Sequence, residues 1–197
     1  KEKKMLSYEE SLKILKETRA LIEGHFILSS GLHSPKYVQC AQLLSKPTKS
    51  FNICKSLAEK ISESFNEFDL ILSPAMGGIV VGYEIGKILN KESIFAERMN
   101  NVFILRRDFN IKKKSKVLIV EDVITTGKSS LECSKLVTNA GAEIVGYACI
   151  IDRSKNKSLI KEKIVSQIEL DIPTYTKDKL PKSLSLIEAV KPGSRNI

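Results

Sequence analysis

The sequence has no tryptophan, and only two histidines and four cysteines occur among its 197 residues. No CxxC pair occurs and no histidine pair lies beside a cysteine, so the spacing indicates neither a zinc site nor a redox motif. We therefore expect buried, reduced thiols at Cys40, Cys54, Cys133 and Cys149. His25 and His33 have no partner visible in the sequence, and we expect a structural or solvent-facing role for both rather than general-base catalysis.

The sequence also lacks any run of about 18 apolar residues, which a membrane-spanning helix would need. Its Lys-rich start, KEKKMLSYEE, leads into an amphipathic pattern rather than the apolar core of a signal peptide. We expect a cytoplasmic protein without a membrane partner. Internal repeats and low-complexity linkers are missing too, and a single domain of this length buries about 70% of the surface of its unfolded chain. Such a core requires no metal or disulfide for stability.

The formal net charge of +9 is unevenly distributed. Seven Lys or Arg residues lie between positions 98 and 116 against one acidic residue, Asp108. A basic protein can bind nucleic acid, a membrane surface or an anionic substrate. Because this segment has no interleaved ladder of aromatic residues, it is unlike the surface of a single-strand binder. We expect a solvated turn for the lysines of residues 112–116, and no specific nucleic acid partner.

The first part of the chain predicts two helices with short strands between them. Ser7 and Glu10 form a capping box, and the apolar spacing that follows predicts a helix over about residues 8–22, ended by Gly24. Residues 24–44 contain β-type residues interrupted by Ser, Gly and Pro, which is typical of short strands and a turn. Pro47 favours the start of a second helix, which we expect to run to about residue 65.

The rest of the chain repeats a strand, turn and helix pattern. DLILS is followed by PAMGG and a helical segment, and KVLIVED is followed by VITTG, a second helical segment and AEIVGYACIID. Continuous apolar strands indicate a sheet that is covered on both faces. Between these units, SIFAE and NNVFILRR are predicted to form strands, the second being half of a hairpin or an excursion that carries Arg106 and Arg107. The pattern predicts an α/β domain with a mainly parallel sheet.

The stretch VLIVEDVITTGKSS, residues 117–130, has the composition of a phosphate-binding loop. Unpaired N–H groups at a helix N-terminus bind anions, Gly127 lets the backbone approach closely, and hydroxyl side chains can donate hydrogen bonds. Glu121 and Asp122 stand at the carboxyl end of the strand, where α/β sheets bind ligands. Carboxylates there would repel phosphate but accept hydrogen bonds from a diol. Phosphate and a diol together describe ribose 5-phosphate. A Walker A loop is excluded, because Asp122 occupies the position of its first glycine.

VLIVEDVITTGKS resembles the signature of the type I phosphoribosyltransferases over thirteen residues. Further stretches resemble the orotate phosphoribosyltransferase family: GHFILSSGLHSPKY, SPAMGGI, FAER with FILRRDF, IIDRS and the KPGSR tail. This chain has Ser29 where many members carry Lys, and its basic loop is shorter and contains no His. The resemblance implies a single domain over residues 1–197, divided into an N-terminal hood (about 1–45), a core (about 46–155) and a C-terminal element (about 156–197).

The resemblance also implies the reaction and its residues. Ribose 5-phosphate would be transferred from phosphoribosyl pyrophosphate to orotate, in pyrimidine biosynthesis, by a homodimer in which each mobile loop reaches the neighbouring site. Mg²⁺ would be held mainly through the substrate. Arg98, Arg106, Arg107 and Asp122 would be catalytic; Arg153, Thr125 and Tyr37 would bind orotate. Phosphoribosyl pyrophosphate would be bound by Met76, Gly77, Glu121, Asp122, Val123, Ile124, Thr125, Thr126, Gly127, Lys128 and Ser129.

Two other functions remain open at this point. A related enzyme could transfer to a purine or to uracil, although a neutral base has no carboxylate for Arg153 to bind. A regulator could retain the loop and bind nucleic acid through its basic surface. A salt-resistant, sequence-dependent component of binding would identify such a regulator, because nonspecific binding weakens steeply with salt.

Overall fold

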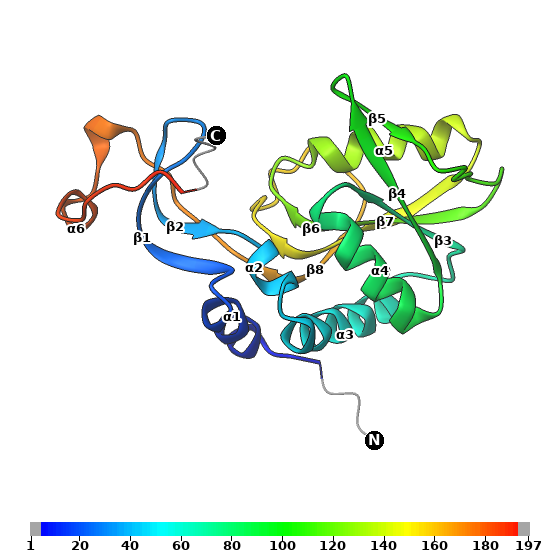
Figure 1. The fold of residues 1–197 in the computed structure, drawn as a ribbon, viewed down its shortest axis with the longest axis horizontal. Coiled ribbons are helices and arrows are strands. Elements are labelled where there is room, and N and C mark those ends of the chain that lie inside the picture. The colour runs from blue at the N-terminus through cyan, green and yellow to red at the C-terminus, as the bar shows by residue number, and fades with distance from the viewer. Residues whose placement is uncertain (1–4, 193–197) are drawn as a thin grey trace.

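The computed structural model describes residues 5–192, and Figure 1 shows an α/β core with a smaller outlying part. The core contains a six-stranded sheet in the order β5-β4-β3-β6-β7-β8, in which only β5 is antiparallel to its neighbour. The strands are β3 (Leu70–Pro74), β4 (Glu92–Met99), β5 (Val102–Leu105), β6 (Lys116–Ile124), β7 (Glu143–Asp152) and β8 (Ile164–Glu169). The predicted mainly parallel sheet and the β4–β5 hairpin are confirmed.

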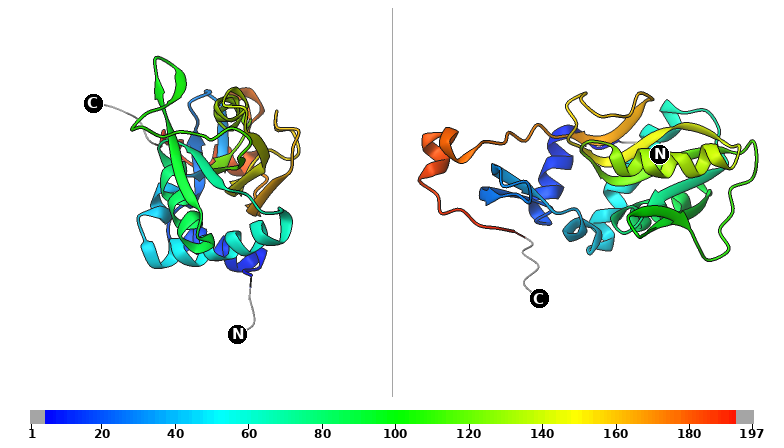
Figure 2. Two further views of the ribbon diagram at one scale, coloured as in Figure 1. Left: turned by 90° about the vertical axis from the view of Figure 1, so that its right-hand side faces the viewer. Right: turned by 90° about the horizontal axis from the view of Figure 1, so that it is seen from above.

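Helices cover both faces of this sheet, as the continuous apolar strands indicate. The helices α3 (Pro47–Ser64) and α4 (Gly77–Leu89) pack on one face, and α5 (Lys128–Asn139) packs on the other (Figures 1 and 2). Along β6, Leu118 and Val120 belong to the cluster under α3 and α4, whereas Val117 and Ile119 belong to the cluster under α5. Alternate residues of one strand therefore enter opposite layers of the core.

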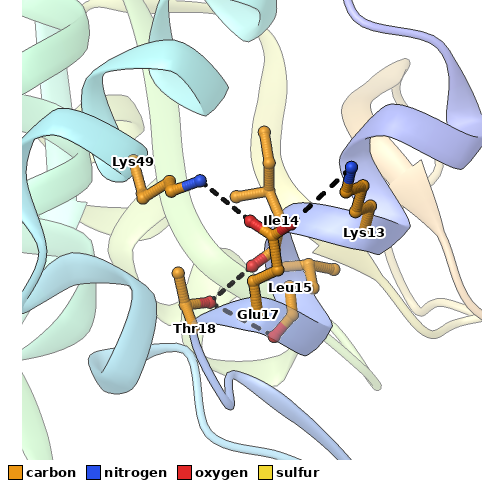
Figure 3. A network of polar contacts seen from close by, with 6 residues as sticks. All are labelled: Lys13, Ile14, Leu15, Glu17, Thr18 and Lys49. Atoms are coloured by element: carbon orange, nitrogen blue, oxygen red, sulfur yellow. Dashed lines mark hydrogen bonds and ion pairs between the residues drawn. The ribbon is translucent and has the colours of Figure 1, made fainter.

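The first helix is shorter than predicted. Its capping box is present, but α1 (Tyr8–Glu17) ends at the C-cap Thr18, and Arg19 adopts a left-handed φ of 61°. The Thr18 hydroxyl donates to the carbonyl oxygens of Ile14 at 2.8 Å and Leu15 at 3.2 Å (Figure 3). The predicted end at Gly24 is wrong, because residues 21 and 22 begin strand β1 (Leu21–Ile27) although their spacing continues the helical pattern.

An exposed polar contact joins α1 to α3. Glu17 accepts a hydrogen bond from Lys49 of α3 at 2.8 Å and lies 3.9 Å from Lys13 (Figure 3). The ammonium group of Lys49 lowers the pKa of the Glu17 carboxyl. All three side chains are well exposed, so this network adds little to stability.

The small N-terminal hood consists of β1 paired antiparallel with β2 (His33–Val38), and α2 (Ala41–Leu44) connects it to α3. Residues 171–192, which include the 3₁₀ helix η1 (Lys177–Lys179) and α6 (Lys182–Ser185), return to this hairpin (Figure 1). Phe26 forms a bridge with Val190, and His33 forms one with Tyr175. The end of the described chain thus completes the hood.

The two histidines join these segments. His25 Nε2 lies 2.6 Å from His33 Nδ1, and His25 Nδ1 lies 2.8 Å from the carbonyl oxygen of Ile187. Because a carbonyl can only accept, His25 Nδ1 carries the proton, and in the neutral pair His33 Nδ1–H then donates to His25 Nε2. Both rings are buried, so each histidine is a structural partner of the other.

The remaining sequence-based predictions concern the domain boundary, the cysteines, the C-terminal tail and membrane-spanning helices. The boundary predicted near residue 155 does not coincide with the end of the central sheet, because β8 is the edge strand of that sheet. All four cysteines are free and buried, as predicted. Gly193, Ser194 and Arg195 of the KPGSR tail lie outside the described residues. Within residues 5–192, no helix has the length and apolarity needed to span a membrane.

Candidate active site

The predicted ligand-binding segments lie along one edge of the central sheet. β3, β6 and β7 are parallel, and they end at Pro74, Ile124 and Asp152. The segments after them therefore emerge at the same edge, where open α/β sheets bind ligands. Arg153 is tied to this edge directly, since its N–H donates to the carbonyl oxygen of Ile124 at 2.8 Å.

The loop before α5 presents exposed hydroxyl and N–H groups. Thr125 and Thr126 are exposed, and Gly127 is the N-cap of α5 with a left-handed φ of 82°. No side chain caps this helix, although the Lys128 N–H approaches Thr126 Oγ1 at 3.3 Å. Open N–H groups and the positive end of the helix dipole favour an anion at this position. The Ile124 side chain is buried in the core, which leaves only its backbone for a ligand.

A second loop supports the phosphate loop from behind. The Leu159 N–H donates to the Thr126 carbonyl oxygen at 2.9 Å. A Cβ atom at Gly127 would lie 2.7 Å from Ser158 Oγ and 2.8 Å from Ile160 Cγ1, so the side chains of the second loop leave no room for a side chain at position 127. Both the left-handed conformation and this contact require glycine at position 127.

The paired carboxylates occupy a half-buried position at the end of β6. Burial, and after it the neighbouring charge of Asp122, raise the pKa of Glu121 to about 8, while a 3.0 Å hydrogen bond from the Ser130 hydroxyl acts in the opposite direction. Burial also raises the pKa of Asp122, although its Oδ1 accepts a hydrogen bond from the Val123 N–H at 2.9 Å. Adjacent, partly desolvated carboxylates are stabilised by hydrogen-bond donors or cations supplied by a ligand.

The loop after β3 meets these carboxylates. A Cβ atom at Gly77 would lie 2.1 Å from Asp122 Oδ2, so the Gly77 backbone packs directly against this carboxylate. The peptide bond between Ala75 and Met76 is cis, and the Met76 side chain is 82% exposed. The structure therefore brings Met76 and Gly77 together with Asp122, although they are far apart in the sequence.

Arg153 has an unusual environment for a guanidinium group. Its side chain is half-buried, its Nε is buried without a hydrogen-bond partner among residues 5–192, and burial lowers its pKa. None of the described acidic residues forms an ion pair with it. The neighbouring Asp152 instead accepts a hydrogen bond from the Ser154 N–H at 2.7 Å. A buried guanidinium nitrogen without a partner is typical of a site that binds an anion.

The three arginines of the hairpin region are all engaged with acidic residues, but to different degrees. Arg98 donates to Glu132 of α5 at 2.6 Å and to the Asn101 carbonyl oxygen at 2.8 Å, and it lies 4.1 Å from the centroid of the Phe103 ring. Arg106 and Arg107 follow β5 and both face Glu97. The predicted role of each at pyrophosphate stays a prediction.

Tyr37 lies apart from these core segments, on β2 of the hood, where its ring packs against Phe26 at a centroid distance of 5.8 Å.

The sequence did not predict Glu97, Ser130 and Ser158, which contact predicted site residues. Glu97 is part of the FAER stretch, so its position gave a weak signal. Nothing in the sequence pattern indicates which partner Ser130 or Ser158 would find.

The arrangement combines three chemical functions at one edge of the sheet. An anion site at the start of α5 lies next to two hydrogen-bond-accepting carboxylates, and a guanidinium group without an acidic partner follows the neighbouring strand. Such a site can hold the phosphate and the diol of a ribose phosphate together with a second, anionic molecule.

Comparisons with known proteins agree with this geometry. Residues 40–178 match the phosphoribosyl transferase domain family. An orotate phosphoribosyltransferase of Parvibaculum lavamentivorans is 44% identical over 193 residues, covering 98% of this chain and 100% of that protein. One of Methylorubrum extorquens is 45% identical over 188 residues, covering 95% and 96%.

Solved structures show the same fold at lower identity. The Aeropyrum pernix orotate phosphoribosyltransferase has a TM-score of 0.70 at 22% identity, covering 80% of this chain and 92% of that one. The Mycobacterium tuberculosis enzyme in complex with inorganic phosphate has a TM-score of 0.65 at 21% identity, covering 81% and 95%. The chain belongs to the phosphoribosyltransferase family, and its sequence places it among the orotate phosphoribosyltransferases.

Proposed function

We propose that this protein transfers ribose 5-phosphate from phosphoribosyl pyrophosphate to orotate, giving orotidine 5′-phosphate and pyrophosphate in pyrimidine biosynthesis. The observation that carries the choice of base is Arg153, whose Nε is buried without a hydrogen-bond partner. A carboxylate can satisfy a guanidinium fork through two parallel hydrogen bonds, whereas a purine or uracil has no carboxylate. The name of the relatives at 44% and 45% identity supports the same choice.

The reaction builds charge at two places. As the bond between ribose C1′ and pyrophosphate breaks, positive charge develops on the ribose and negative charge on the leaving group. Glu121 and Asp122 hold the ribose hydroxyls, and hydrogen bonds donated by these hydroxyls favour the ionised carboxylates, which place negative charge near the ribose. The backbone from Thr125 to Ser129 holds the 5′-phosphate, which fixes the ribose while its other end reacts. Catalysis in this scheme comes from positioning and from electrostatic groups aimed at developing charge.

We infer that the reaction uses Mg²⁺, which would neutralise charge on the pyrophosphate. The donors at the site fit an ion that is held mainly by the substrate. Glu121 and Asp122 are two adjacent carboxylates, whereas Mg²⁺ takes six oxygen ligands, so most of them would come from pyrophosphate, ribose hydroxyls and water. Among the described residues, no group of three or more candidate ligands could hold a metal ion.

A direct assay tests this function. Orotate absorbs in the ultraviolet, and we expect its absorbance to fall when phosphoribosyl pyrophosphate and Mg²⁺ are added to the protein. Adenine, hypoxanthine, guanine and uracil serve as competing acceptors in parallel reactions. Turnover of one of these neutral bases without turnover of orotate would reject the proposal and identify the acceptor.

We also propose that the protein is a homodimer associated through the outer face of α4. Met76, Val80 and Tyr83 repeat at helical spacing along this face and are 82%, 45% and 66% exposed, and Phe51 of α3 is 39% exposed. Lys87 lies 5.9 Å from the Phe51 ring, which connects the two helices into one patch. Exposed apolar patches mark association surfaces. Because Met76 belongs to the ligand loop, association here would bring a second copy next to the site.

Sedimentation tests the dimer. Tyr83→Lys places a charge in the centre of the patch, at a position whose exposure makes the change compatible with folding. We expect the wild-type protein to sediment as a dimer and the variant as a monomer. A variant that remains dimeric would place the interface elsewhere.

A cytoplasmic location also remains a prediction. The four free thiols agree with it, because disulfides are rare in the cytosol.

A further inference from the structure

The contacts of Arg98, Arg106 and Arg107 distinguish three residues that the sequence could not rank. We propose that Glu97 is a positioning residue, which fixes Arg107 as an anchor and leaves Arg106 as the arginine that meets the pyrophosphate. This inference rests on the proposed function, since it concerns the leaving group of that reaction.

Glu97 lies beside the ligand loop because of the sheet register. Ala96 pairs with Pro74, the last residue of β3, and the Ala96 carbonyl oxygen accepts a hydrogen bond from the Ala75 N–H at 2.8 Å. Glu97 is the next residue of β4 and therefore stands level with the start of the loop that contains Met76 and Gly77. Its side chain is only 21% exposed, which is low for a carboxylate at the end of a strand.

Arg107 uses its guanidinium fork on Glu97. Its Nε and one terminal nitrogen each donate to a different carboxylate oxygen at 3.0 Å, which is the bidentate arrangement. The guanidinium group also lies 5.7 Å from the Phe95 ring, whose other neighbour is Phe109 at a centroid distance of 5.2 Å. Hydrogen bonding to Arg107 lowers the pKa of Glu97, so the carboxylate is ionised at neutral pH. Arg107 is thus held on two sides.

The backbone at Arg107 indicates the same role. Arg107 and Asp108 have φ angles of 60° and 58°, a left-handed conformation that residues with a side chain adopt infrequently. Two successive residues in this region form a tight turn, which is closed by a 3.1 Å hydrogen bond from the Phe109 N–H to the Arg106 carbonyl oxygen and supported by contacts outside the turn. The bidentate pair with Glu97 and the Phe95 contact provide them. Releasing Arg107 toward a ligand would remove both.

Arg106 makes weaker contacts with acidic residues than Arg98 and Arg107 do. Its closest acidic contact is a single terminal nitrogen 3.8 Å from a Glu97 oxygen that already accepts from Arg107. Arg98 points to the opposite layer, where Glu132 of α5 and the Phe103 ring hold it. Arg106 therefore keeps most of its five donors for a pyrophosphate that arrives at the loop beside Glu97. These contacts all lie within one chain, so Arg106 is free to meet the pyrophosphate of its own subunit or that of a neighbouring subunit.

Five variants test this division of roles: Arg106→Ala, Arg107→Ala, Glu97→Gln and the double variants Glu97→Gln/Arg107→Ala and Glu97→Gln/Arg106→Ala. Turnover with saturating orotate and phosphoribosyl pyrophosphate is measured together with the affinity for Mg²⁺-pyrophosphate by calorimetry. We expect Arg106→Ala to lower turnover by about a hundredfold, as removal of a group that stabilises developing negative charge does. It should also weaken pyrophosphate binding.

Glu97→Gln and Arg107→Ala should each cause a smaller loss, and the two losses should be equal. Because both variants break the same pair, their double variant should be no worse than either single one. In the Arg106→Ala background, Glu97→Gln should change pyrophosphate binding little, since the arginine that meets the pyrophosphate is already gone. A residue with a merely structural role would lower activity equally in both backgrounds.

Glu17→Gln is the matched control. Glu17 is also a carboxylate that contacts two cationic side chains, Lys49 at 2.8 Å and Lys13 at 3.9 Å, but it lies on α1 away from the ligand loops. Its turnover should equal that of the wild type. Three outcomes would overturn the proposal: a larger loss for Arg107→Ala than for Arg106→Ala, additive losses for Glu97→Gln and Arg107→Ala, or tighter pyrophosphate binding by Glu97→Gln. Failure of the wild type to use orotate would instead reject the proposed function.

Discussion

The substitution Arg153→Ala tests how the site chooses its base. Arg153 is positioned by its own backbone, whose N–H bonds to Ile124, so truncating the side chain should leave the strand end in place. The change removes a guanidinium group whose Nε is buried and has no partner within the described residues. Because none of the described acidic residues forms an ion pair with Arg153, the substitution breaks no ion pair within the described chain. We therefore expect the loss to fall on the reaction with orotate.

The expected magnitude follows from the burial of this group. Truncating one partner of a desolvated, charge-assisted pair costs about 2–5 kcal/mol, because the other charge is then buried without a partner. Since 1.4 kcal/mol corresponds to about a factor of ten, kcat/KM for orotate should fall at least about thirtyfold. An exposed ion pair would be worth less than about 1 kcal/mol, which separates the two explanations. The affinity for phosphoribosyl pyrophosphate should change much less, because its proposed binding site is the separate loop around Thr126.

The measurement is kcat/KM for each substrate, with the other held at saturation. Arg153→Lys is the comparison variant, and it should fall between the wild type and Arg153→Ala because Lys keeps the charge but not the fork. Equal losses for the two substrates would show that Arg153 supports the whole site rather than the base. An unchanged kcat/KM for orotate would refute the carboxylate contact and reopen the choice of acceptor.

Three other predictions follow from the carboxylates and the hairpin. The double variant Glu121→Gln/Asp122→Asn should lose turnover severely while its circular dichroism spectrum is unchanged; normal turnover would exclude the ribose assignment. The pKa of Glu121 is about 8 in the folded protein, above its usual value of 4.5, so the stability that it contributes is complete below about pH 4.5 and is lost as the pH rises through about 8. The unfolding temperature of Glu121→Gln, relative to that of the wild type, should therefore increase between pH 5 and pH 9, and an equal pH dependence of the two proteins would contradict the burial of this charge. If the dimer shares its sites, an inactive Arg106→Ala/Arg107→Ala chain mixed with an inactive Asp122→Asn chain should regain activity, and no recovery after proven subunit exchange would place each site within one chain.

The local elements were predictable because their signals are local. The continuous apolar runs of β3, β6 and β7 and the Pro47 start of α3 correspond to the observed elements. The predicted end of the first helix was wrong for a specific reason. Leu21 and Ile22 extend the helical spacing, but Arg19 in a left-handed conformation ends the helix before them. Spacing alone could not detect that turn. The short elements α2, η1 and α6 gave no recognisable pattern.

Contacts between distant segments were less predictable. The loops after β3 and β6 could be placed at one edge, since parallel strands end together, and Gly77 indeed packs against Asp122. The pairing of His25 with His33 could not be predicted, because it depends on a bulged register between β1 and β2. The bidentate contact of Arg107 with Glu97 joins residues across a hairpin whose exact register the sequence does not reveal.

The closure of the hood by residues 171–192 has a consequence for synthesis on the ribosome. His25 and its partner Ile187 are separated by 162 residues, which take on the order of ten seconds to translate. During that interval β1 and β2 form an isolated two-stranded hairpin, which is marginally stable by itself. All six strands of the central sheet are complete by residue 169, so the core can form while the hood is still open. A chain that stops before residue 187 would therefore have a complete central sheet. Its defect would lie near the N-terminus, among the first thirty residues to be made, where β1 would lack its partner segment.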